Sequence, residues 1–71
     1  MSPTELRLVV NGEQRALPPG ATVCDVVAEL RGSPDGLAVA LNGDVVPRSA
    51  WSATHPADGD RVEIITAAPG G

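Results

Sequence analysis

The sequence predicts an α+β fold in which a sheet of four or five strands has one helix packed across it. Two Asn-Gly turns separate segments of alternating apolar residues, and one further segment repeats its apolar residues with the period of a helix. With 71 residues, the chain is long enough for one core. We expect one domain over residues 1–66, in the order strand, strand, helix, strand, short strand, crossover and strand, followed by a flexible C-terminal arm over residues 67–71.

Residues 4–10 form the first predicted strand, because leucine and valine recur there at every second position. Asn11-Gly12 follows directly, and both residue types tolerate the positive φ that the centre of a type I′ turn requires. Residues 13–17 should therefore return as the antiparallel partner of the first strand. Pro18-Pro19-Gly20 ends this hairpin, since proline has no backbone N–H to donate.

The predicted helix follows Thr22, which is a good N-cap, and it has Asp25 near the positive end of the helix dipole. Its apolar stripe consists of residues at helical spacing: Val23, Val26, Val27 and Leu30. Arg31, Gly32 and Pro34 supply a cation, a C-terminal glycine and a stop. Because β-branched valines have poor helix propensity, packing on the sheet has to stabilise this helix.

A second hairpin is predicted after the helix. Residues 37–41 alternate again, and Asn42-Gly43 provides the turn into a short strand over residues 44–47. Pro47 cannot donate a hydrogen bond to a neighbouring strand, so this short strand suits an edge of the sheet.

Residues 48–56 have no clear period and indicate an ordered crossover that contains Trp51. We interpret Trp51 as a side chain that fills the end of the core, and the alternative is an exposed anchor for a partner. Residues 61–66 form the last predicted strand, with Ile64 on the core face and Ile65 on the opposite face.

Size and charge restrict the class of protein. A chain this short has no room for a deep catalytic cavity, so we expect a carrier or binding module and not an enzyme. Nine Asp and Glu against five Arg give a net charge of −4, and the chain has one aromatic residue. A nucleic-acid-binding protein needs a basic stripe and aromatic side chains for stacking, so we expect no nucleic acid partner. No apolar run reaches the length of a membrane span, which favours a cytoplasmic protein without membrane contact.

Cys24 and His55 are the only residues of their types, so they cannot form an internal disulfide or a structural zinc site. No metal site is predicted. We interpret Cys24 as a small buried apolar residue of the helix, with a sulfur-handling thiol as the alternative. His55 is expected in a loop.

The main candidate for a reactive group is the carboxylate that follows Gly70-Gly71. Five residues can extend about 16–18 Å beyond the last strand, so this carboxylate could enter a partner's active site while the domain stays outside. Glycine has no Cβ and can approach a phosphate or a sulfur atom closely. ATP would activate the carboxylate as an acyl adenylate, which a thiol or persulfide could attack. The alternative is a frayed tail without function.

Residues 17–23, residues 39–51 with the segment Asn-Gly-Asp-Val-Val-Pro-Arg, and residues 57–67 resemble the ThiS family, as do the closing glycines. These proteins are the sulfur carriers of thiamine biosynthesis and have the ubiquitin-like β-grasp fold. The resemblance covers nearly the whole chain, and the Asn-Gly-Asp segment is more specific than Gly-Gly, which several ubiquitin-like carriers share. Pro69 departs from the family pattern as a stiff residue near the terminus.

The resemblance implies a mechanism. A ThiF-type adenylyltransferase would use ATP and Mg to adenylate the Gly71 carboxylate, and Gly70 and Pro69 would enter the partner's active site with it. A persulfide donor of the cysteine desulfurase or rhodanese type would then supply sulfur, giving a thiocarboxylate. A ThiG-type thiazole synthase would take that sulfur into the thiazole ring. The chain itself would bind no cofactor and would be a protein cosubstrate. The resemblance also implies that the final strand is central and parallel to the first, so that the sheet of four or five strands is mixed.

Three other functions stay open at the level of sequence. The carrier could donate sulfur to another acceptor, in molybdopterin, cysteine or tRNA thiolation. It could be a ubiquitin-like protein modifier. It could also be an interaction module that uses its sheet face and does not need the terminal glycines.

Overall fold

Seven short elements follow one another in the predicted order in the computed structural model, which describes residues 5–66. The elements are β1 (Leu6–Val10), β2 (Glu13–Leu17), α1 (Val23–Arg31), β3 (Leu37–Leu41), β4 (Asp44–Val46), the 3₁₀-helix η1 (Arg48–Ala53) and β5 (Arg61–Thr66). None of the helices in residues 5–66 is long and apolar enough to cross a membrane.

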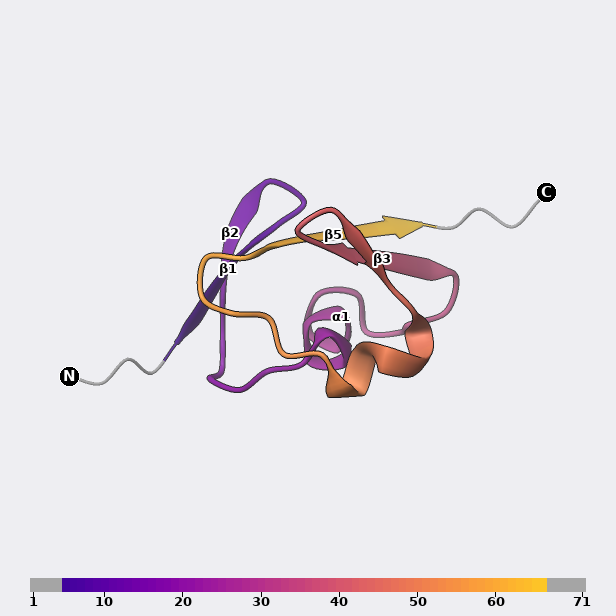
Figure 1. The fold of residues 1–71 in the computed structure, drawn as a ribbon, viewed down its shortest axis with the longest axis horizontal. Coiled ribbons are helices and arrows are strands. Elements are labelled where there is room, and N and C mark those ends of the chain that lie inside the picture. The colour runs from indigo at the N-terminus through magenta and orange to yellow at the C-terminus, as the bar shows by residue number, and fades with distance from the viewer. Residues whose placement is uncertain (1–4, 67–71) are drawn as a thin grey trace.

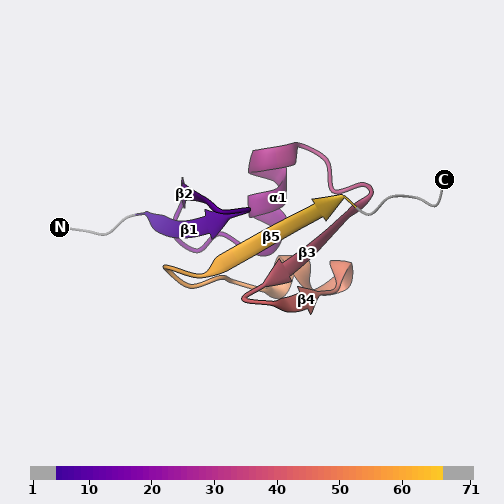
Figure 2. The same cartoon turned by 90° about the horizontal axis from the view of Figure 1, so that it is seen from above.

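The strands form one five-stranded sheet in the order β2-β1-β5-β3-β4. β1 and β5 are parallel, and the other neighbouring pairs are antiparallel. Figure 2 shows β5 running through the middle of the sheet, with the first hairpin on one side and the second on the other. This topology confirms the mixed sheet, the edge position of the short fourth strand and the central, parallel last strand. It is the β-grasp fold.

The core lies between the sheet and the two helices, which cover the same face (Figure 1). It consists of buried apolar side chains from both layers: Leu6, Leu8, Val10, Leu17, Ala21, Val23, Val26, Val27, Val39, Trp51, Val62 and Ile64. The alternation predicted for β1 and β5 therefore matches the observed burial. Leu30 of the predicted helical stripe is half-buried and packs against this core.

Both Asn-Gly turns have the predicted backbone. The φ angles are 51° at Asn11 and 82° at Gly12, and 51° at Asn42 and 89° at Gly43. Positive φ at both central positions matches the right-handed twist of the flanking strands, which explains why each turn closes a tight hairpin.

The ends of α1 also agree with the sequence. The hydroxyl of Thr22 accepts the backbone N–H of Asp25 at 3.1 Å, and the Asp25 carboxylate accepts the backbone N–H of Thr22 at 2.9 Å. These two bonds form a capping box, which satisfies donors that the first helical turn leaves free. Gly32, with φ 81°, ends the helix and donates to the carbonyls of Ala28 and Val27.

Two predicted features of the elements need correction. Pro47, predicted as the end of the fourth strand, is the N-cap of η1, which lies in the segment predicted as an ordered crossover. A 3₁₀-helix of six residues that buries one side chain, Trp51, leaves no apolar period in the sequence. Cys24 is exposed, so its interpretation as a buried residue is wrong. It follows Val23 directly, and successive residues of a helix point in directions about 100° apart.

Candidate functional site at the end of strand β5

The three residues predicted to carry the function, Pro69, Gly70 and Gly71, lie outside the described residues. The same is true of the whole predicted arm, residues 67–71. The structure describes the base from which this segment continues, which is the end of β5 at Thr66. The contacts that hold β5 in the sheet therefore determine the geometry of the candidate site.

β5 is paired over different lengths on its two sides. On the β3 side the register runs from Val62, opposite Leu41, to Thr66, opposite Leu37, so the strand is paired up to its last residue. On the β1 side the paired positions end at Val62, opposite Val10. Beyond Val62, no residue of β1 lies beside β5, because β1 ends at Val10 and the chain enters the Asn11-Gly12 turn.

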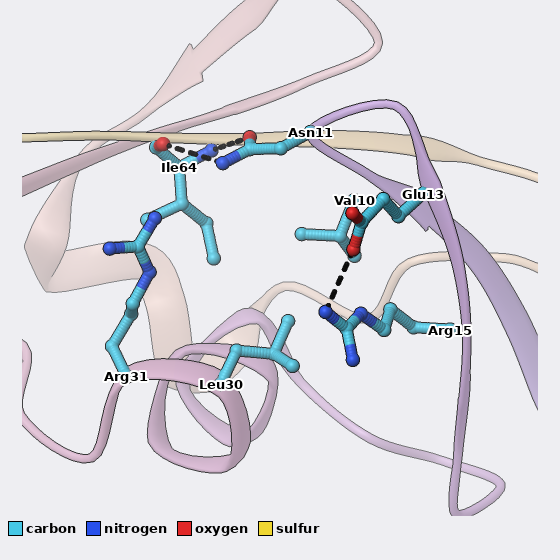
Figure 3. A pocket seen from close by; sticks show the side chains of 7 residues that line it. All are labelled: Val10, Asn11, Glu13, Arg15, Leu30, Arg31 and Ile64. Atoms are coloured by element: carbon cyan, nitrogen blue, oxygen red, sulfur yellow. Dashed lines mark hydrogen bonds and ion pairs between the residues drawn. The ribbon is translucent and has the colours of Figure 1, made fainter.

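The side chain of Asn11 continues this contact on the β1 side. Its Oδ1 accepts the backbone N–H of Ile64 at 2.8 Å, and its Nδ2 donates to the carbonyl oxygen of Ile64 at 3.1 Å. Figure 3 shows the amide facing the backbone of Ile64 with both bonds drawn. The sequence predicted Asn11 as a turn residue only. Glycine would also fit this turn position, but asparagine adds an amide that can form hydrogen bonds. The choice of asparagine was the one sign in the sequence that residue 11 has a second role.

The start of β5 is fastened by its own set of bonds. Asn42 accepts the backbone N–H of Arg61 through Oδ1 at 2.9 Å, and its own N–H donates to the Arg61 carbonyl at 2.8 Å. In the preceding turn, Asp58 accepts the N–H of Arg7 at 2.8 Å, and Gly59 donates to the Arg7 carbonyl at 2.7 Å. These two bonds connect the turn before β5 to β1.

The outer face of the sheet, opposite the helices, has apolar residues near the end of β5. Ile65 is 53% exposed and lies opposite Ala38 of β3, while Val45 is 76% exposed and lies opposite Ala40. The exposure of Ile65 confirms its predicted position on the face away from the core. Ile65 is the last large apolar side chain before the predicted arm.

An open groove of about 360 Å³ lies on the core side of β5. Its lining comes from the first hairpin, α1 and β5, and consists of Val10, Asn11, Glu13, Arg15, Leu30, Arg31 and Ile64. Figure 3 shows the guanidinium groups of Arg15 and Arg31 on opposite walls. Arg15 pairs with Glu13 at 2.9 Å, and both side chains are well exposed, so solvent screens this pair and it contributes little to stability.

Two titratable side chains away from β5, Asp25 and His55, contact backbone groups of the fold. The backbone N–H of Thr22, followed by its side chain, holds the pKa of the Asp25 carboxyl below its ordinary value of 3.8. His55 lies in a loop, as predicted, with Nδ1 at 3.2 Å from the carbonyl oxygen of Gly20. Over residues 5–66, no three His, Cys, Asp or Glu side chains gather as they would around a metal ion.

Comparison with known proteins agrees with this arrangement. The chain is 32% identical to thiamine biosynthesis protein ThiS of Geobacter metallireducens, and the structures agree with a TM-score of 0.78 over 93% of this chain and 100% of the other. It is also 35% identical over 66 residues to a thiazole synthase of Paramagnetospirillum magneticum. That match covers 93% of this chain and 20% of the synthase, so the chain spans about a fifth of this relative's length. The sequence profile of the ThiS family matches residues 7–71, and the chain therefore belongs to the ThiS family.

Proposed function

We propose that this chain is a sulfur carrier of thiamine biosynthesis and that the carboxylate of Gly71 carries the sulfur. The observation that carries this proposal is the match to the ThiS family, which runs from Arg7 in β1 to Gly71. The similarity in fold to a ThiS protein over its full length supports it. A well-anchored central strand leading to the glycines is what a carrier with a C-terminal reactive group requires.

The chemistry would proceed in three steps. A carboxylate oxygen of Gly71 attacks the α-phosphorus of ATP, forming an acyl adenylate and releasing pyrophosphate. The terminal sulfur of a persulfide then attacks the acyl carbon and expels AMP, giving an acyl disulfide. A thiol reduces the S–S bond by two electrons, which leaves a thiocarboxylate on Gly71 and a disulfide on the thiol side. Activation is needed because a carboxylate by itself is a poor electrophile.

The partners would supply every catalytic group. We assign the first step to a ThiF-type adenylyltransferase that holds ATP and Mg, and the sulfur to a persulfide donor of the cysteine desulfurase or rhodanese type. Gly70 and Pro69 would enter the adenylyltransferase with Gly71. The chain would bind no cofactor and catalyse no step, and it would act in the cytoplasm.

A thiazole synthase is the proposed acceptor enzyme. The similarity of this chain to a fifth of a thiazole synthase supports the choice, because a carrier-like segment in the same polypeptide as the synthase links the two in one function. In this proposal a ThiG-type enzyme takes the sulfur from the thiocarboxylate of Gly71 into the thiazole ring.

Growth of a strain that lacks this chain tests the choice of acceptor. We expect the strain to require thiazole or thiamine, and we expect the intact gene to restore growth while a gene lacking the Gly71 codon does not. A strain that thiamine fails to rescue, but that shows loss of molybdopterin, cysteine or thiolated tRNA, would assign the carrier to another acceptor. Conjugates between this chain and lysine side chains in lysates would instead identify a protein modifier.

A further inference from the structure

The two Asn-Gly turns have nearly the same backbone conformation, but their asparagine side chains bind different positions of the same strand, β5. The φ angle is 51° at both Asn11 and Asn42. Asn42 binds Arg61, the first residue of β5, whereas Asn11 binds Ile64, the fourth of its six residues. The pair provides an internal comparison, since both asparagines occupy the same position in turns of nearly the same conformation.

The bonds of Asn11 replace a missing stretch of β1. Backbone bonds on this side include one from the N–H of Val9 to the carbonyl of Asp60, just before β5, and one from the N–H of Asn11, just after β1, to the carbonyl of Val62, both at 3.0 Å. The next carbonyl and N–H of β5 on this side belong to Ile64. The flat amide of Asn11 presents an acceptor and a donor to them, as the peptide group of a further β1 residue would.

We propose that Asn11 is a positioning residue for the C-terminal arm. By binding both backbone groups of Ile64, it holds β5 from the β1 side to within two residues of Thr66. Without these bonds, β5 beyond Val62 would be paired on the β3 side alone, and its end could swing about that single neighbour. This inference rests on the proposed function, in which the end of β5 is the point from which the arm carries the Gly71 carboxylate into the partner. Reaction rates depend steeply on such placement, because the reacting atoms have to be held in contact.

The turn alone does not require asparagine. Glycine adopts positive φ more easily than any other residue, and aspartate tolerates it about as well as asparagine does. Neither can make both bonds to Ile64. Glycine has no side chain, and the aspartate carboxylate has acceptors only, which would set a negative oxygen against the Ile64 carbonyl. A residue that serves the turn alone can therefore be distinguished from one that also positions the strand.

The test compares Asn11→Gly and Asn11→Asp with Asn42→Gly and Asn42→Asp in the full chain. Carrier-dependent exchange between pyrophosphate and ATP is measured with a ThiF-type adenylyltransferase at a temperature at which all five proteins are folded. We expect both Asn11 variants to lower kcat by about tenfold, because the carboxylate is misplaced, and to change KM for the carrier little, because the docked body is the same. The Asn42 variants should keep kcat within about twofold of the parent chain, although they also lose a bond to β5.

Hydrogen exchange at single amides provides a second readout that does not depend on any partner. The amide of Ile64 should exchange about tenfold faster or more in Asn11→Gly than in Asn42→Gly, because the Ile64 N–H loses the Asn11 oxygen as its acceptor. Equal kcat in the Asn11 and Asn42 variants would overturn the inference. Exchange at Ile64 that is no faster in Asn11→Gly than in Asn42→Gly would also overturn it. If the parent chain itself is inactive, but exchange at Ile64 is faster in Asn11→Gly, the proposed function is wrong. The contact of Asn11 with β5 would in that case still hold the strand.

Discussion

The pKa of the exposed Asp25 carboxyl depends on whether the chain is folded. It accepts the backbone N–H of Thr22 at 2.9 Å, and this bond is the largest cause of its lowered pKa. The Thr22 side chain lowers the pKa further, and the charge of His55 adds a smaller decrease. A carboxyl whose pKa is lower in the folded than in the unfolded chain stabilises the fold when it is ionised.

The sign of the resulting pH dependence follows from this shift. The stabilisation by Asp25 is fully present above the ordinary value of 3.8 and is lost as the pH falls through the lower folded-state pKa. We therefore predict that the parent chain loses more unfolding free energy between neutral pH and pH values below 3.8 than Asp25→Asn does. Urea titrations of both proteins at several pH values measure the difference. Parallel pH profiles would show that the capping box does not depend on ionisation.

At the scale of elements, η1 is organised around Trp51, which is 2% exposed. The indole Nε1 donates to the carbonyl of Val46 at 2.9 Å, so the helix is bonded to the end of β4. The guanidinium carbon of Arg48 lies over the indole ring, 5.2 Å from its centroid, as in a cation–π contact. The burial of Trp51 confirms that it fills the end of the core and rules out the alternative of an exposed anchor.

We predict that Trp51→Phe lowers the free energy of unfolding by about 1–3 kcal/mol, because the Val46 carbonyl loses its donor and the smaller ring leaves space in the core. Ser52→Ala is the matched control, since Ser52 is exposed in the same helix and should change stability by less than about 0.5 kcal/mol. Chemical denaturation followed by circular dichroism measures both. Similar stability of the two variants would mean that η1 is not anchored by the indole.

At the scale of the whole molecule, the parallel pairing of β1 and β5 determines where the chain enters and leaves the fold. Neighbouring parallel strands point the same way, so the start of β1 at Leu6 and the end of β5 at Thr66 lie at opposite ends of the sheet (Figure 2). Additions to the two termini should therefore have different consequences for a function that depends on Gly71.

The sequence was sufficient to predict most of this architecture, because its signals are local. Alternating apolar residues predict the strands, the two Asn-Gly turns predict the hairpins, and the capped valine stripe predicts the helix. The resemblance to the ThiS family implied the central position of the last strand and its parallel pairing with the first. The bonds from Asn11 to Ile64 could not be predicted, because they join residues 53 positions apart and depend on the strand order. The exposure of Cys24 and the helix around Trp51 depend on which side each residue presents to a core built from distant segments.

The intact mass of the chain after incubation with a ThiF-type adenylyltransferase, ATP, Mg and a persulfide donor tests the central claim most directly. We predict that one oxygen is replaced by one sulfur in the untagged chain and in a chain extended at the N-terminus. A chain extended beyond Gly71 should fold equally well and stay unmodified, because its glycine carbonyl lies within a peptide bond. An unchanged mass of the untagged chain, while another ThiS protein is converted by the same enzymes, would contradict the assignment of this chain as a sulfur carrier.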